Sequence, residues 1–244
     1  MSILFVSDVH VGAQTARATQ AFLEFVRGPA HDAQAVYLLG DVFDAWLGDD
    51  DLRPPHPHVA HALAALVQGG TQVNAVHGNH DFLLGSAFME ATGANLLPEV
   101  STLMLGEHYT VLCHGDELCT DDLKYQRYRQ YTRDGANQQQ FLALSLAERG
   151  QEAMRLRQAS AQATAEKAEN IMDVNAEAVA ALLRQHGGSW LIHGHTHRPA
   201  DHALTVDGRE CARFVLGNWH EHESILEWNG QALVRTTVDA LKGR

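Results

Sequence analysis

Residues 3–10 read Ile3-Leu4-Phe5-Val6-Ser7-Asp8-Val9-His10, a short apolar run that ends in an aspartate and a histidine. Apolar runs of this length, bounded by polar turn residues, are typical of buried strands. The arrangement recurs along the chain, with Gly, Asp, Asn or His close behind most of the runs. The other runs lie at 35–39, 72–77, 109–113, 190–192, 213–216, 224–228 and 232–238. We therefore expect a sheet that gathers polar side chains at the carboxyl ends of its strands.

Helical patterns separate the early strands, at about 16–27, 58–68 and 83–91. Alternation of strand and helix predicts an α/β fold with a largely parallel sheet covered by helices. The late strands have no helices between them, and this predicts a second, more antiparallel sheet in that part of the chain.

Residues 121–186 differ from the rest, because they contain no proline and are rich in Ala, Gln, Glu and Arg. We expect helices at about 122–132, 138–148, 150–169 and 174–186. An all-helical stretch between two strands predicts a lid over a site at the strand ends. The predicted domains are a core formed by 1–120 and 187–244, and a helical lid insertion at 121–186.

Composition excludes several classes of protein. The chain has 244 residues and a net charge of −12, which argues against a non-specific nucleic-acid binder. Three scattered cysteines are too few for a disulfide framework or a zinc ribbon. The chain begins without a basic leader, and no apolar run approaches the ~18–20 residues of a membrane span. We expect a cytoplasmic protein.

Five short motifs carry the chemistry: Asp8-Val9-His10, Gly40-Asp41, Gly78-Asn79-His80-Asp81, His114-Gly115-Asp116 and Gly194-His195-Thr196-His197. Each motif alone is common in turns, but five at successive strand ends indicate one site. Carboxylates, imidazoles and an amide oxygen suit Mn²⁺, Fe²⁺, Ni²⁺ or Zn²⁺. The set is too large for a single ion that also binds water, and it suits two ions about 3.5–4 Å apart. Asp41, the lone carboxylate of the second motif, is the natural bridging ligand.

The order of these motifs resembles that of the calcineurin-like metallophosphoesterases, which read DxH, GDxxD, GNH[DE], a later H, and GHxH. The resemblance implies a sandwich of two mixed β-sheets flanked by helices. It also implies two metal sites that share Asp41. One site would be formed by Asp8, His10, Asp41 and His197, and the other by Asp41, Asn79, His114 and His195. The residues it implies for catalysis are His80, His114, His195 and Asp41.

Four longer stretches, at 39–50, 114–122, 171–175 and 190–199, are similar to the family of pyrophosphatases that cleave UDP-2,3-diacylglucosamine in lipid A biosynthesis. This resemblance implies attack at the α-phosphorus and release of UMP and 2,3-diacylglucosamine 1-phosphate. The ligand set and the cytosolic metal supply make two Mn²⁺ ions per chain our first choice of cofactor, although other divalent metals would fit. The resemblance further implies a monomer on the cytoplasmic face of the inner membrane. The positions it implies for substrate binding are Asn79, His80, Asp122, Ser160, Thr164, Lys167 and His195.

Two positions depart from that family's usual pattern. His80 stands where the family has Arg, and Thr164 stands where it often has Asn. A sugar phosphate leaves without a strong acid, because its second pKa is about 6. We therefore expect His80 to stabilise charge on the phosphate more than to protonate the leaving group.

The predicted lid carries apolar and basic side chains. The apolar ones either pack the lid onto the core or line a slot for two acyl chains: Tyr125, Tyr128, Tyr131, Phe141, Leu142, Leu144, Leu146 and Met154. The basic ones predict docking to an anionic membrane surface: Lys124, Arg127, Arg129, Arg133, Arg149, Arg155 and Arg157.

Two further interpretations remain open. A different dimetal phosphoesterase, such as a nucleotide pyrophosphatase or phosphodiesterase, would use the same motifs. A non-catalytic binding module would share the scaffold. His56, His58 and His61 belong, in our interpretation, to a solvated loop that leads into a helix, and His220 has no ligand partner at a useful spacing.

Overall fold

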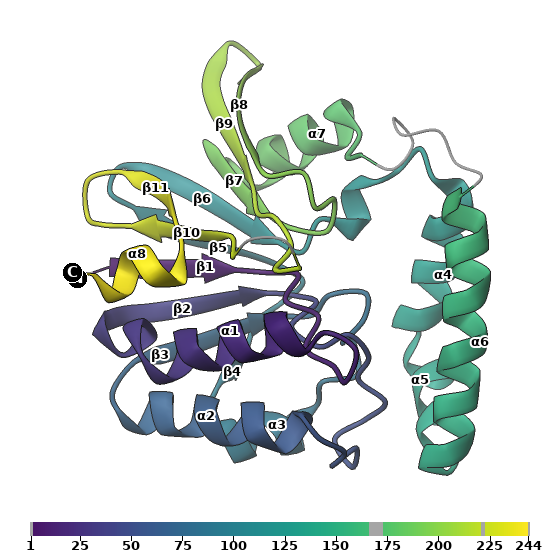
Figure 1. Ribbon diagram of the computed structural model, residues 1–244. Helices are drawn as coiled ribbons and strands as arrows, with labels where there is room; N and C mark the ends of the chain where they lie inside the picture. Colours follow the sequence, from purple (N-terminus) through teal and green to yellow (C-terminus); the bar gives the residue numbers. More distant parts are fainter. Residues whose placement is uncertain (1, 166–172, 221–222, 244) are drawn as a thin grey trace.

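Two β-sheets form the centre of the molecule (Figure 1). The computed structural model describes residues 2–165, 173–220 and 223–243, and it describes the side chains of these residues except at 159–165. Ser160 and Thr164 therefore lie on a described helix with undescribed side chains, and Lys167 lies outside the described residues. No helix in the described ranges is long and apolar enough to cross a membrane.

The first sheet has six strands in the order β11-β10-β1-β2-β3-β4. Strands β1 to β4 run parallel, and β10 and β11 add to β1 in antiparallel fashion. The strands are β1 (Ser2–Val6), β2 (Ala33–Leu39), β3 (Gln72–Val76), β4 (Asn95–Leu96), β10 (Ile225–Trp228) and β11 (Leu233–Thr236).

The second sheet has five strands in the order β5-β6-β7-β9-β8, with both parallel and antiparallel pairs. The strands are β5 (Val100–Leu105), β6 (His108–Cys113), β7 (Trp190–His193), β8 (Ala200–Val206) and β9 (Arg209–Val215). Two mixed sheets confirm the predicted fold class. The placement of the closing strand pair in the second sheet was wrong, since β10 pairs with β1 through Ile3 and Trp228.

Three layers of apolar side chains join the elements: one between the first sheet and the helices on its outer face, one between the two sheets, and one on the outer face of the second sheet. Helices α1 (Ala16–Arg27), α2 (His56–Gln68) and α3 (Ser86–Thr92) cover the outer face of the first sheet. Side chains such as Phe5, Leu112 and Ile192 fill the space between the two sheets. Their full burial supplies most of the stabilisation of this interface, since buried apolar area contributes about 25 cal/mol per Å².

Helices α4 (Leu123–Arg133), α5 (Gly135–Leu142) and α6 (Leu146–Ala165) stand to one side of both sheets (Figure 1). Helix α7 (Ala176–His186), which the prediction assigned to the same insertion, lies on the second sheet instead. The reason is its apolar face, because Val179 and Leu183 are buried against Val111 and Leu191. The group of helices that projects from the sheets is therefore α4–α6.

The breaks that separate α4, α5 and α6 follow from helix capping. Asp134 accepts hydrogen bonds from the amides of Ala136 and Asn137, so α5 begins at Gly135, before the predicted start at 138. Ser145 and Glu148 form a reciprocal capping box that begins α6 at Leu146. The sequence pattern Ser-x-x-Glu carried this signal, and the periodicity alone missed it.

Candidate metal centre

The loops that follow β1, β2, β3, β6 and β7 meet at one edge of the molecule. Backbone hydrogen bonds hold them together: the Asp8 amide donates to the Gly40 carbonyl at 3.1 Å, and the Gly194 amide donates to the His114 carbonyl at 2.8 Å. All seven predicted metal ligands lie on these loops, because parallel neighbouring strands end at the same edge.

An unusual backbone conformation marks the predicted ligands. Six non-glycine residues in the described ranges have positive φ, and five of them are predicted ligands: Asp8 and His10 and Asp41 at 53°, His197 at 56° and His195 at 66°. Side chains with a Cβ adopt this region at some energetic expense, so surrounding contacts must hold it in place. Backbone strain of this kind concentrates at functional sites.

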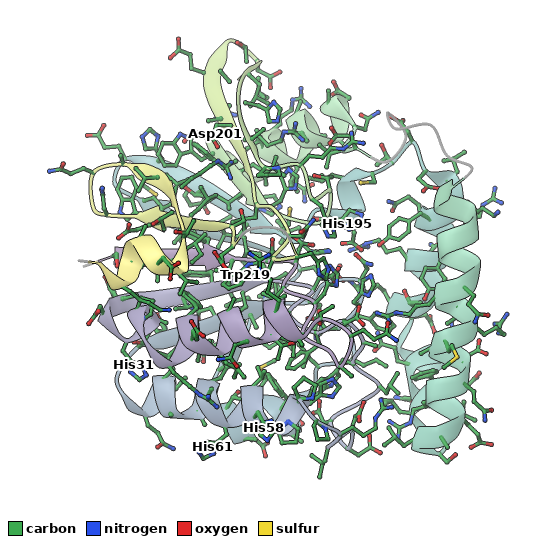
Figure 2. All side chains as sticks on the ribbon, in the orientation of Figure 1. His31, His58, His61, His195, Asp201 and Trp219 are labelled. Atoms are coloured by element: carbon green, nitrogen blue, oxygen red, sulfur yellow. The ribbon has the colours of Figure 1, made fainter. Side chains whose placement is uncertain are left out.

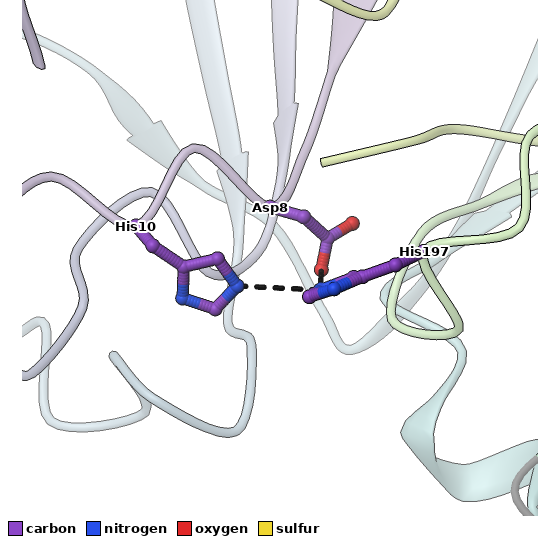
Figure 3. A group of neighbouring side chains, drawn as sticks. All are labelled: Asp8, His10 and His197. Atoms are coloured by element: carbon purple, nitrogen blue, oxygen red, sulfur yellow. Dashed lines mark hydrogen bonds and ion pairs between the residues drawn. The ribbon is translucent and has the colours of Figure 1, made fainter. Parts of the chain in front are cut away.

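Three of these side chains converge on one point (Figure 3). The Nε2 atom of His197 lies 3.2 Å from Oδ1 of Asp8 and 3.3 Å from Nε2 of His10. Two imidazole nitrogens that face each other at this distance share at most one proton. A cation placed among these three side chains could accept one lone pair from each imidazole nitrogen and one from the carboxylate oxygen.

Asp41 lies at the centre of the remaining ligands. Its Oδ2 atom is 3.5 Å from Nε2 of His114 and 3.9 Å from Nε2 of His10. The Nε2 atom of His114 is also 3.0 Å from Oδ1 of Asn79. Asp41 therefore lies between the two predicted groups of ligands, in the place expected of a residue that both ions share.

His195 is the one predicted ligand that stands slightly apart. Its ring centre lies 5.1 Å from that of His114 and 5.6 Å from that of Tyr125. Its backbone amide donates to the Asp8 carboxylate at 3.0 Å, which binds the last motif to the first.

The donor set fits divalent cations. Asp8 and Asp41 are almost completely buried, at 0% and 1% exposure, and buried carboxylates require a partner of positive charge. Burial lowers the pKa of His10 to about 4 and that of His195 to about 4, so both imidazoles are neutral and able to ligate. Burial opposes ionisation of Asp41 as well, yet the nearby His114 and His80 hold its pKa well below the usual value.

His80 lies at the rim of this cluster. Its Nδ1–H donates to the carbonyl oxygen of Asp44 at 2.8 Å, and its Nε2 lies 4.0 Å from Oδ2 of Asp41. One third of the side chain is exposed. The Asp44 carbonyl thereby orients the ring with Nε2 toward the Asp41 carboxylate.

Asp81 holds the loops after β2 and β3 together. Its buried carboxylate accepts hydrogen bonds from the amides of Gly78 and Val42, both at 2.8 Å, and from those of Asp41 and Phe43. Burial and the neighbouring Asp41 raise its pKa. Its four backbone contacts fix the positions of both loops.

Some contacts beside the cluster were not predicted from the sequence. The buried Asp116 carboxylate accepts a hydrogen bond from the Tyr125 hydroxyl at 2.9 Å, which places Tyr125 against His195. The ring of His220 stacks on that of His10, with ring centres 5.6 Å apart. The contact of Tyr125 with His195 and that of His220 with His10 have no local sequence signal, because each joins segments far apart in the chain.

The other conspicuous histidines lie away from the cluster. His31, His58 and His61 are on the side of α2, far from His195 (Figure 2). His56 does not lie in a solvated loop as predicted. It begins α2 and is buried, with its ring 5.0 Å from that of Trp46.

Arginines of α4 and α6 join these helices to the core. Arg149, which is 3% exposed, donates to the Leu47 carbonyl at 2.5 Å and forms a two-pronged ion pair with Asp50. Arg157 donates to the Asp44 carbonyl at 2.6 Å, and Arg133 donates to the Gly78 carbonyl at 3.0 Å.

These contacts change the interpretation of the basic side chains. Arg129 pairs with Asp116 and Glu99. Together with Arg133, Arg149 and Arg157, it makes four of the seven predicted membrane-facing cations that bind the core instead. Arg155 pairs with Glu152 within α6. The acidic residues at the core's rim attract these arginines, and composition alone could not show that.

Replacement of Arg149 by methionine tests whether this anchor holds the helices. Methionine keeps the apolar stem but removes every hydrogen bond to Leu47 and Asp50. We expect the free energy of local opening of α5 and α6 to fall by about 1–2 kcal/mol, a value reduced by the exposure of Asp50. Amide hydrogen exchange measured by mass spectrometry would show faster exchange in α5 and α6 and unchanged exchange in β1–β3.

Arg155→Gln is the matched control, since this arginine pairs only within its own helix among the described residues. It should leave the exchange of α5 unchanged. Equal exchange in Arg149→Met and the wild type would show that other contacts hold the helices.

The sequence profile of the calcineurin-like phosphoesterases matches residues 1–199. A UDP-2,3-diacylglucosamine hydrolase of Aromatoleum aromaticum is 48% identical over 94% of each chain. A protein of the same name from Sodalis glossinidius is 47% identical over 93% of this chain and 94% of its own. A third protein of this name, from Serratia proteamaculans, is 43% identical over 96% of this chain and 97% of its own. With its clustered carboxylates and imidazoles and with this similarity along nearly its whole length, the chain is a hydrolase that belongs to the calcineurin-like phosphoesterase family.

Proposed function

We propose that the protein hydrolyses the pyrophosphate of UDP-2,3-diacylglucosamine at the α-phosphorus, giving UMP and 2,3-diacylglucosamine 1-phosphate for lipid A synthesis. The observation that carries the proposal is the extent of the similarity. The relatives named UDP-2,3-diacylglucosamine hydrolase match 93–96% of the chain at 43–48% identity, which includes most of the α4–α6 region as well as the ligand loops. A relative that shared only the metal chemistry would not need to match these helices.

Two divalent ions are proposed as cofactors, with Mn²⁺ as the first choice. Asp8, His10, Asp41 and His197 would hold one ion, and Asp41, Asn79, His114 and His195 would hold the other. When bound, the ions supply an activated water and neutralise charge on the nonbridging phosphate oxygens.

The chain's own residues then position the phosphate. The Asn79 amide and the His195 ring lie beside His114, where their N–H donors would reach a nonbridging oxygen of a phosphate bound at the cluster. His80, with its Nδ1–H bound to the Asp44 carbonyl, presents Nε2 toward the same space. From this position it would contact a nonbridging oxygen of the phosphate.

Helices α4–α6 are the proposed acyl-chain lid. Apolar side chains remain exposed there, among them Tyr131 at 60%, Met154 at 63% and Leu142 at 41%, and an acyl chain would cover them. Phe141, in contrast, packs against the apolar layer between the first sheet and α1–α3, so it attaches the lid to the core. Further substrate contacts are proposed for Asp122, which caps α4, and for Ser160, Thr164 and Lys167.

The cellular setting is proposed from the same reasoning. A diacylated substrate resides in a membrane, so the enzyme would work as a monomer at the cytoplasmic face of the inner membrane. Exposed apolar side chains of the lid, rather than its mostly paired arginines, would make that contact.

Hydrolysis in ¹⁸O-labelled water tests the reaction. Attack at the α-phosphorus places the label in UMP, and mass spectrometry of the products reads this directly. Label in the sugar phosphate would refute attack at that atom. Faster hydrolysis of a soluble nucleotide than of the diacylated substrate in detergent would favour a different phosphoesterase.

Replacement of His80 by alanine tests the role of this imidazole. A charge-stabilising donor acts on any phosphate at the cluster, so kcat/KM should fall by a similar factor, roughly 10- to 100-fold, for the sugar nucleotide and for an alkyl phosphodiester. Steady-state assays with both substrates measure the two ratios.

A much larger loss on the alkyl ester would show that His80 protonates poor leaving groups. A loss confined to the sugar nucleotide would assign it to binding of that substrate alone.

A further inference from the structure

A hollow lies beside the metal centre, at the ends of β10 and β11. Its volume is about 290 Å³, close to the lower end of the ~300–1,000 Å³ typical of small-molecule sites. His197 forms one wall. Most of the remaining lining surface is apolar, with Pro199 and Ile225 among the lining residues. Polar side chains interrupt it: Asn218, Glu223, Ser224, Arg235, Thr236 and Thr237.

The sheet order places this hollow opposite the lid. The arginines of α4 and α6 bind the loops that follow β2 and β3, whereas β10 and β11 lie on the other side of β1. The Asp8 and His10 loop follows β1 and lies between the two. In Figure 1, α4–α6 and the β10–β11 pair are accordingly on opposite sides of the strand ends.

His197 connects the hollow directly to the reaction centre. The imidazole that lines the hollow also has its Nε2 atom 3.2 Å from Asp8 and 3.3 Å from His10. A substrate with its phosphate at the cluster and its acyl chains under α4–α6 would therefore project its other half toward the hollow.

Three polar side chains of the hollow can form further hydrogen bonds, one as an acceptor and two as donors. Glu223 is partly buried, and its carboxylate has no hydrogen-bond or ion-pair partner among the described side chains. The Oδ1 atom of Asn218 accepts from the His220 amide at 3.0 Å, which leaves the Nδ2 donors available. Ser224 Oγ accepts from the Gly217 amide at 2.8 Å and retains its own hydrogen for donation.

Arg235 is already occupied in this structure. It binds Asp201 at 2.5 Å and the Ala200 carbonyl at 2.8 Å, so it shapes the wall. The remaining set of carboxylate, amide and hydroxyl matches a nucleoside, because a carboxylate accepts from ribose hydroxyls and an amide pairs with a pyrimidine imide. An acyl chain would cover the apolar surface but leave these polar groups without partners, whereas a nucleoside covers the surface and also forms hydrogen bonds with them.

We propose that this hollow binds the nucleoside half of the substrate, with Glu223 accepting hydrogen bonds from the ribose hydroxyls and Asn218 donating to the base. The assignment rests on the proposed nucleotide-sugar substrate. It adds a binding site for uridine that is separate from the metal ligands and from the lid.

The test measures binding and turnover separately. Glu223→Gln removes the charge but keeps the shape, and loss of a charged hydrogen bond should weaken UMP binding roughly 10- to 100-fold. Isothermal titration calorimetry with UMP gives this value without turnover. In steady-state assays KM should rise by a similar factor while kcat stays within about twofold.

A substrate with 2′-deoxyuridine identifies the partner of the carboxylate. The wild type should lose affinity for it, and Glu223→Gln should discriminate little between the two sugars, because the interaction is already absent. Asn218→Ala should weaken UMP binding but keep the discrimination between ribose and deoxyribose. Glu210→Gln, an exposed carboxylate on β9 outside the hollow, is the matched control and should behave as the wild type.

The outcomes separate the two proposals. If the wild type does not hydrolyse the sugar nucleotide, the proposed function fails. If it does, but Glu223→Gln binds UMP as the wild type does, the nucleoside site is wrong. A rise in KM that depends on acyl-chain length instead of on the 2′-hydroxyl would place the lipid half in the hollow and overturn the assignment.

Discussion

Asp41→Asn should lower kcat/KM by at least about 10³-fold while the fold remains intact. The carboxylate lies between His10 and His114, within 4 Å of both, and it is the residue proposed to serve both ions. Loss of an outer partner of a metal site costs 10- to 100-fold, so loss of the central charge should cost more. Asparagine has the same shape and can still accept from the His80 amide, which Asp41 Oδ1 binds at 2.8 Å.

Three measurements together decide this prediction. Steady-state assays give kcat/KM, elemental analysis gives the metal content per chain, and circular dichroism gives Tm. We expect metal content to fall below the two ions proposed for the wild type. Asp32→Asn, at an exposed carboxylate in the short helical turn Pro29–Asp32, is the control and should change none of the three. Turnover near the wild-type rate in Asp41→Asn would end the two-metal interpretation.

Gly78→Ala should destabilise the protein and abolish activity together. A Cβ at this position would collide with the side chain and the backbone nitrogen of Asp41. Because the clash involves backbone atoms, the loops after β2 and β3 must move apart. This movement would stretch the hydrogen bonds by which Asp81 joins the same two loops. Overpacking of this kind costs about 1–3 kcal/mol or more. Thermal denaturation should show Tm lower by roughly 2–4 °C for each kcal/mol.

Gly135→Ala is the matched control, because a Cβ there meets no heavy atom within 4 Å. Alanine at the start of α5 should leave Tm unchanged or raise it slightly. If Gly78→Ala kept both its Tm and its activity, the close approach of the two loops would not be required for the site.

Much of the fold was predictable because it depends on local patterns. Helix α1 lies at the predicted residues, and β1, β2 and β3 lie within two residues of the predicted runs. Helix α1 carries one apolar face, and the three strands are nearly continuous apolar runs because residues on both faces of the sheet are buried. Strand β8, in contrast, is exposed along most of its length and has no such pattern, so it was missed.

Assignments that depended on distant partners were less predictable. The helical character of α7 was evident, but its place on the second sheet depends on Val111 and Leu191, which lie far away in the chain. The basic side chains of α4 and α6 suggested a membrane surface, yet Arg149 and Arg133 bind the rim of the core. Net charge and spacing do not state which acidic group an arginine meets.

For the candidate site, the sequence by itself determined the ligand types and their order at strand ends. That was enough to predict the family and a two-metal site, because parallel strands deliver their carboxyl ends to one edge. Only the tertiary structure decided how those ligands face each other. The left-handed backbone at Asp8, His10 and Asp41 is maintained by contacts between loops, because a residue with a Cβ stays in this region only where the surrounding structure holds it. The clamp at Asp81 and the hollow beside His197 arise in the same way, since each requires segments that only the folded chain brings together.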